Sequence, residues 1–109
     1  MQAGLGSPSS PYLSCISSVS SISNNINLIG IYVNNSNSNI IDVSNNTNLI
    51  KIFISNNTAN DTNNILDTLI NTPRVGLKEM LFDYNAAIDQ SKVTTLVTNG
   101  WDITQDGQP

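Results

Sequence analysis

Two consecutive segments of the chain repeat one pattern of apolar and polar positions. Residues 18–38 read SVSSISNNINLIGIYVNNSNS, and residues 39–59 read NIIDVSNNTNLIKIFISNNTA. When the second segment is aligned position by position with the first, at an offset of 21 residues, eight positions are identical. Four more exchange similar apolar residues, such as Tyr32 and Phe53. The apolar positions keep both residue type and order, which chance matching of asparagine and serine does not explain. The two segments therefore predict two copies of one structural unit.

Within each unit, the spacing LxxIxVxx(S/N) predicts a short strand whose alternate residues point inward. The copies begin at Leu28 and Leu49, and a third begins at Leu77 and ends at Asn85. We expect a buried asparagine at the end of each strand to bond the backbone where the chain turns, a role that Ser36 would fill less completely in the first unit. Ile31, Val33, Ile52, Ile54, Met80 and Phe82 are expected to stack between coils. The expected outward strand face consists of Tyr32, Lys51, Phe53, Glu79 and Leu81, together with Gly30.

The return side of the second unit is expected to point Ile41 and Val43 inward and Asp42 outward. The SNN triplets suit turns, because a short amide side chain bonds its own backbone and tolerates left-handed geometry. We expect these asparagines to form a turn ladder, that is, equivalent turns in successive units. A ligand site is the alternative interpretation.

After residue 60 the apolar spacing becomes helical. Ile65, Leu66, Leu69 and Ile70 form one stripe, which predicts a helix over 63–71 with a Thr62/Asn63 cap and a stop at Thr72-Pro73. Val93, Leu96 and Val97 predict a second helix ending at Asn99-Gly100, and 101–104 predicts a closing strand. Residues 60–104 are thus expected to form a helix-strand-helix cap, followed by a tail at 105–109. Trp101 is expected to seal the last coil; an exposed sugar-binding aromatic is the alternative.

Residues 1–17 combine glycines, prolines and serines with few large apolar side chains. We expect this segment to be an extended anchoring arm beside the repeat domain of residues 18–109. Its partner-binding residues would be Tyr12, Leu13 and Ile16, docking on another protein or a sister chain. The open edge of the first unit could instead be closed by the arm of the same chain.

Composition narrows the possible chemistry. Asparagine, serine and threonine supply 41 of 109 residues, whereas the net charge is −4 with four basic residues and no histidine. Nucleic acid is therefore an unexpected partner. The longest apolar runs have six residues, so no membrane span is predicted. The N-terminus also lacks the basic start and apolar core of a secretory signal, so we expect the chain to stay where it is synthesised.

Candidate catalytic and metal-binding groups are few. Cys15 is the sole cysteine and lacks a histidine to activate it, so we expect an apolar contact. Asp83, Asp89, Asp102 and Asp106 could be read as a calcium cluster, but they lack the DxDxDG spacing and are expected to be solvated. A glycan-cleaving acid pair is disfavoured, because no two acids share a context that would separate their pKa values. We expect no enzyme activity, catalytic residue, cofactor or metal.

The units IIDVSNNTNLIKIFISNN resemble the asparagine-rich leucine-rich repeats of Bacteroidetes surface proteins and of fibre or appendage proteins of their phages. The resemblance covers about residues 18–104. It implies an α/β fold: a short solenoid of parallel strands with a 21-residue period and a C-terminal cap. It further implies a non-enzymatic structural or adhesive component of a phage virion, such as a minor head or tail protein, a decoration protein or a fibre. Such a component would assemble in the host cytoplasm with other virion proteins, as an oligomer or within a large complex. A protein- or glycan-binding module on a bacterial cell surface is the alternative.

Overall fold

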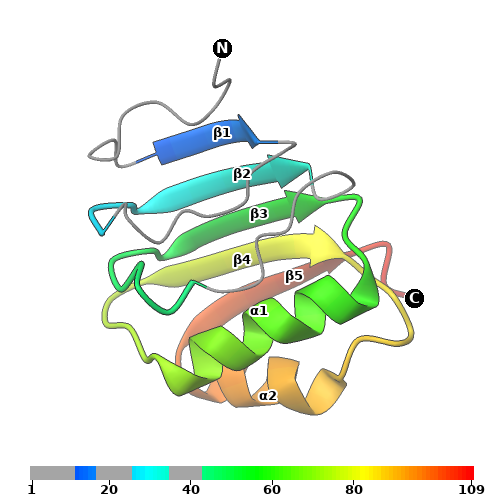
Figure 1. Ribbon diagram of the computed structural model, residues 1–109. Helices are drawn as coiled ribbons and strands as arrows, with labels where there is room; N and C mark the ends of the chain where they lie inside the picture. The colour runs from blue at the N-terminus through cyan, green and yellow to red at the C-terminus, as the bar shows by residue number, and fades with distance from the viewer. Residues whose placement is uncertain (1–11, 17–25, 35–42) are drawn as a thin grey trace.

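A parallel β-sheet with two helices on one of its sides forms the described part of the chain (Figure 1). The computed structural model describes residues 12–16, 26–34 and 43–109. The strands are β1 (Tyr12–Ile16), β2 (Gly30–Asn34), β3 (Lys51–Ser55), β4 (Lys78–Asp83) and β5 (Trp101–Asp106), and the helices are α1 (Ala59–Asn71) and α2 (Gln90–Thr98). The expected α/β class with parallel strands is confirmed. No helix among these residues is long and apolar enough to cross a membrane.

The strands lie in the sheet in their chain order, and every neighbouring pair is parallel. Strands β2 and β3 pair in the register of the sequence repeat, with Gly30 opposite Lys51. Lys51 in turn lies opposite Glu79, and Glu79 lies opposite Asp102. More residues separate Lys51 from Glu79, and Glu79 from Asp102, than separate Gly30 from Lys51. The reason is that each of these two connections contains a helix, α1 or α2.

The predicted arm contributes the backbone of β1, which pairs with β2 of the same chain. Tyr12 lies opposite Gly30 and Leu13 opposite Ile31, and the register shifts before Ile16 reaches Val33. Residues 1–11 and 17 of the arm, the start of the first repeat and the positions Ile41 and Asp42 lie outside the described residues. Docking of Tyr12, Leu13 and Ile16 on a partner stays a prediction.

A hydrophobic core lies between the sheet and the elements that cover it. The expected inward positions of β2, β3 and β4 are all buried, and Trp101 is 4% exposed, as expected of a residue that seals the last coil. The described loop residues before β2 and β3 add side chains to this core, and the two helices lie on one side of the sheet (Figure 1). The core residues from these covering elements are Leu28, Val43, Leu49, Ile65, Leu66, Leu69, Ile88, Val93 and Leu96.

Asparagine side chains of the second sequence repeat bond to the first repeat. The Asn48 side chain donates to the Ile26 carbonyl at 3.3 Å, and the Asn56 amide donates to Asn34 Oδ1 at 3.2 Å. Asn56 has a φ of 55°, the left-handed conformation that asparagine tolerates better than most residues. These contacts support the predicted turn ladder.

Asn57 performs the backbone-bonding role predicted for the asparagine at a strand end, but it is half-buried rather than buried, and Asn85 of the third copy is exposed. The Asn57 Oδ1 accepts from the Asp83 N–H at 2.8 Å, and its Nδ2 donates to the Asp83 carbonyl at 3.1 Å and to Thr62 Oγ1 at 2.7 Å. Both backbone groups of a residue at the end of β4 are therefore satisfied from the connection between β3 and α1. The corresponding Ser36 lies outside the described residues.

The first helix begins earlier than the sequence pattern predicted. Its N-cap is Thr58, whose hydroxyl accepts from the Asp61 N–H at 3.1 Å. Thr62, the expected cap, is fully buried within the helix, where the Asn57 side chain bonds its hydroxyl. The apolar stripe begins after the first helical turn, so periodicity alone placed the start too late. The closing strand likewise runs to Asp106 rather than to residue 104.

The third copy of the strand motif differs from the first two at its leucine. Leu28 and Leu49 are fully buried, whereas Leu77 is 94% exposed. Leu77 follows the helix-containing connection, in which α1 contributes Ile65, Leu66 and Leu69 to the core. The third copy thus has the spacing of the motif, but its leucine does not contribute to the core.

Arg74 holds the return loop of the second repeat to the end of α1. It is 7% exposed, and its Nη2 donates to the carbonyls of Val43 at 2.6 Å and Asn46 at 2.8 Å. Its Nη1 donates to the Thr72 carbonyl at 2.6 Å. Burial lowers the pKa of the guanidinium. Three backbone carbonyls from two distant segments therefore converge on one side chain.

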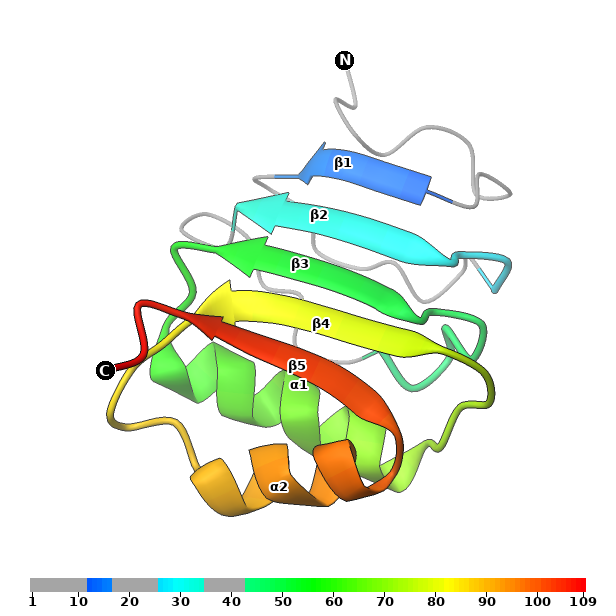
Figure 2. The ribbon, with the colours of Figure 1, turned by 180° about the vertical axis from the view of Figure 1, so that it is seen from behind.

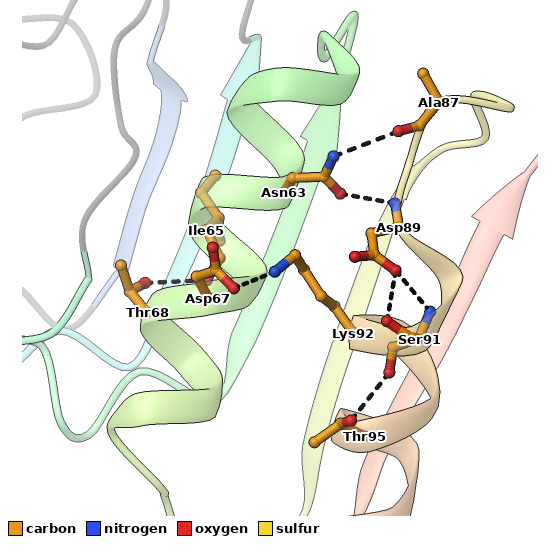
Figure 3. A network of polar contacts seen from close by, with 9 residues as sticks. All are labelled: Asn63, Ile65, Asp67, Thr68, Ala87, Asp89, Ser91, Lys92 and Thr95. Atoms are coloured by element: carbon orange, nitrogen blue, oxygen red, sulfur yellow. Dashed lines mark hydrogen bonds and ion pairs between the residues drawn. The ribbon is translucent and has the colours of Figure 1, made fainter.

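Polar contacts also join the two helices (Figure 3). The Asn63 side chain donates to the Ala87 carbonyl at 3.3 Å and accepts from the Asp89 N–H at 2.8 Å. One turn further along α1, Asp67 forms an ion pair with Lys92 of α2 at 2.5 Å. These contacts fix α2 beside α1 before the chain enters β5.

Acid dependence of stability is expected from Asp89, the N-cap of α2. The hydroxyl and backbone N–H of Ser91 donate to its carboxylate and, with the nearby Lys92 charge, lower the pKa of Asp89. The stabilisation is therefore present above the ordinary carboxyl pKa and is lost as the pH falls through the lowered value. Asp89→Asn keeps a capping side chain without the charge. Circular dichroism melts from pH 2 to 7 should show the wild type more stable at pH 7 and the two proteins converging as the pH falls through the lowered pKa of Asp89. Parallel curves would contradict this role.

Candidate binding face of the sheet

Figure 2 shows the sheet from the side opposite the helices, where strand register aligns residues in rows that cross the strands. Strand register places Tyr32 opposite Phe53, Phe53 opposite Leu81, and Leu81 opposite Thr104. We call these four residues the apolar row. Neighbouring in-register positions on one face of a sheet are close enough for their side chains to interact. The row is therefore a continuous apolar strip that ends in a threonine methyl and hydroxyl on β5.

The apolar row is only partly covered by the protein itself. Tyr32 is 56% exposed and Leu81 is 37% exposed, whereas Phe53 is half-buried. The rings of Tyr32 and Phe53 meet edge to face, with centroids 4.9 Å apart at an interplanar angle of 76°. This packing holds the two aromatic side chains in a defined arrangement while leaving apolar surface in water. Exposed apolar surface rimmed by polar groups is typical of an interaction site.

A polar row borders the apolar row toward the start of the strands. In this row Lys51 lies opposite Glu79, and Glu79 opposite Asp102. Lys51 Nζ and Glu79 Oε1 are 3.8 Å apart, an exposed ion pair of the kind that adds little stability. An open hollow of about 260 Å³ lies here, lined by these three residues together with Leu77, Lys78 and Gly100.

A second hollow, of about 130 Å³, lies toward the ends of the strands. Its lining combines three residues of the apolar row, Tyr32, Phe53 and Leu81, with two acids, Asp83 of β4 and Asp106 of β5, which are in register. The Asp83 carboxylate accepts from the Asn56 N–H at 2.7 Å. The remaining lining residues are Val33, Ile54 and Ser55. This hollow therefore has the aromatic rings of Tyr32 and Phe53 and the carboxylates of Asp83 and Asp106 in one lining.

The structure places all five residues of the expected outward strand face on this side of the sheet. The alternation of exposed and buried positions along β2, β3 and β4 follows the predicted inward and outward pattern except at Gly30, an expected outward position that is buried. What this face contacts stays a prediction. The side chains of the arm residues and of Cys15 lie outside the description, although their backbone forms β1.

The four aspartates considered as a calcium cluster do not all come together, although Asp83 and Asp106 are in register on adjacent strands. Asp89 caps α2, Asp83 accepts from the Asn56 N–H, and Asp102 and Asp106 are exposed on β5. Among the described residues, no group of three or more histidine, cysteine, aspartate or glutamate side chains could hold a metal ion.

Sequence reasoning did not assign Asp83, Asp102 and Asp106 to the outward strand face. The signal that could have found them is the alternation within KEMLFD and WDITQD, which places Asp83 on the side of Leu81, and Asp102 and Asp106 on the side of Thr104. The register between β4 and β5 then brings Asp83 beside Asp106.

Comparisons with protein-family models, with curated proteins and with solved structures give no match to this chain.

Proposed function

We propose that this protein is a non-enzymatic adhesive or structural component of a larger assembly. We further propose that its contact surface is the side of the sheet opposite the helices, which we call the open face. The apolar row carries this proposal. Three large side chains are aligned across three strands, and the edge-to-face contact of Tyr32 and Phe53 leaves the aromatic surface available to a partner. A surface that is apolar at its centre and polar at its rim has the composition of a protein interface.

We further propose that the fold is a short leucine-rich-repeat-like solenoid with a helix-strand-helix cap. Supporting observations are the sequential parallel strand order, the pairing of β2 with β3 in the register of the sequence repeat, and the asparagine contacts between coils. In this proposal, β4, β5 and the two helices form the cap. Stacked coils bury their shared core and leave the strand face free for binding.

The proposed assembly is a phage virion, which the resemblance of the repeats to phage fibre and appendage proteins favours; a bacterial cell surface is the alternative. Association through the arm or with further copies would make the chain part of an oligomer or larger complex. Immunogold labelling with antiserum against the purified chain distinguishes the two locations. Label on phage particles supports the virion, and label on the bacterial envelope supports the alternative.

Replacing Tyr32 with serine tests the contact surface. We expect the wild-type chain to select ligands from a glycan array or a displayed peptide library, and Tyr32→Ser to weaken that binding about tenfold, as truncation of an aromatic anchor does. Val97→Ser is the matched control, because Val97 is an apolar residue that is 51% exposed on α2, in the helical layer. Loss of binding in Val97→Ser with retention in Tyr32→Ser would contradict the proposal.

A further inference from the structure

The charge of the open face differs from that of a balanced protein surface. Among the described residues of β2 to β5, this face carries one base, Lys51, and four acids: Glu79, Asp83, Asp102 and Asp106. The Lys51–Glu79 ion pair balances one of these acids. Three carboxylates therefore remain, all on β4 and β5.

The chain's other basic side chains are engaged elsewhere. The sequence has four lysines and arginines in total. Arg74 is buried against backbone carbonyls, Lys78 is buried with its Nζ 3.0 Å from the Gly76 carbonyl, and Lys92 pairs with Asp67 between the helices. None of these three can neutralise the carboxylates at the ends of β4 and β5.

The carboxylates adjoin the apolar row. Asp83 and Asp106 are directly opposite one another on adjacent strands, an arrangement in which like charges repel. Both line the 130 Å³ hollow together with Tyr32, Phe53 and Leu81. A cationic group placed there would relieve the repulsion, and the aromatic rings would favour it further.

We propose that the partner of the open face is a basic protein segment that lays an apolar side chain on the apolar row and a lysine or arginine beside Asp83 and Asp106. This inference rests on the proposed function and adds the chemistry of the partner. An acidic segment would bring further negative charge to the three carboxylates. A neutral glycan could stack on the aromatic rings but would leave the repulsion between the carboxylates in place.

The test uses three capped synthetic hexapeptides in which leucine alternates with lysine, glutamine or glutamate. Amide chemical shifts of the labelled full chain report binding of each peptide and its location. We expect the lysine peptide to bind most tightly, with shifts on β3, β4 and β5. Its affinity should fall as sodium chloride rises from 50 to 500 mM, since salt screens exposed charges.

Two variants identify the carboxylates that act. Asp106→Asn should weaken binding of the lysine peptide about threefold, and Asp83→Asn combined with Asp106→Asn about tenfold, while binding of the glutamine peptide is unchanged. Asparagine at position 83 retains an oxygen that can accept from the Asn56 N–H, so the fold is preserved. Asp61→Asn, which removes one charge from the first turn of α1, is the control and should leave binding unchanged.

The inference and the proposed function fail in different ways. The inference is overturned if the glutamine or glutamate peptide binds as tightly as the lysine peptide, if the lysine peptide shows no binding at 5 mM, or if neutral maltohexaose binds more tightly than any peptide. If a ligand binds regardless of its charge and Tyr32→Ser abolishes that binding, the open face is still the contact surface. In that case only the inference of a basic partner is wrong. Binding that maps to the helices and ignores Tyr32→Ser overturns both.

Discussion

Replacing Leu49 with alanine is expected to lower the free energy of unfolding by about 3 kcal/mol, because it removes a fully buried side chain and leaves a cavity beneath the sheet. Leu49 is part of the core formed by the loops, strands and helices. Such a loss is a large fraction of the stability of a domain of this size. Urea unfolding followed by circular dichroism measures it.

Leu77→Ala is the control from the same sequence motif. Leu77 occupies the corresponding position in the third copy but is 94% exposed, so its truncation should change the free energy of unfolding by less than about 0.5 kcal/mol. Equal losses for the two variants would mean that Leu77 is buried and that the third copy packs as the first two do.

Replacing Arg74 with methionine is the second change with a large expected effect. Methionine occupies a similar volume but cannot donate to the carbonyls of Val43, Asn46 and Thr72. Hydrogen bonds from a charged group contribute about 1.5–3 kcal/mol each, and relief of the buried charge offsets part of their loss. We expect a net destabilisation of about 3 kcal/mol, again measured by urea unfolding.

Arg74→Lys separates charge from geometry. Lysine keeps the positive charge but lacks the planar fork that reaches two segments at once, so we expect it to recover only part of the lost stability. Hydrogen exchange should show faster opening of the Leu49 amide in the methionine variant, because the loop at 43–46 is no longer held to α1. A methionine variant as stable as the wild type would show that the buried charge cancels the value of its hydrogen bonds.

By itself, the sequence determined the local features of this protein. The alternation in GIYVN, KIFIS and KEMLFD predicted which side chains of β2, β3 and β4 are buried, and the apolar stripes predicted both helices. The observed register of β2 with β3 matches the 21-residue offset of the sequence repeat, and the expected asparagine at the strand end describes the backbone bonds of Asn57. These features follow from periodicity and from the hydrogen-bonding capacity of short side chains, both of which act over a few residues.

Only the tertiary structure decided the features that depend on distant segments. Leu77 matches the repeat motif but is exposed, whereas Leu28 and Leu49 are buried, and the connection before Leu77 contains α1, which adds its own side chains to the core. Arg74 is uninformative in the sequence, because its carbonyl partners at 43 and 46 come from a separate loop. The carboxylates of the open face became neighbours of the apolar row through the register of β4 with β5. Long-range pairing is a collective result of packing, which no local pattern encodes.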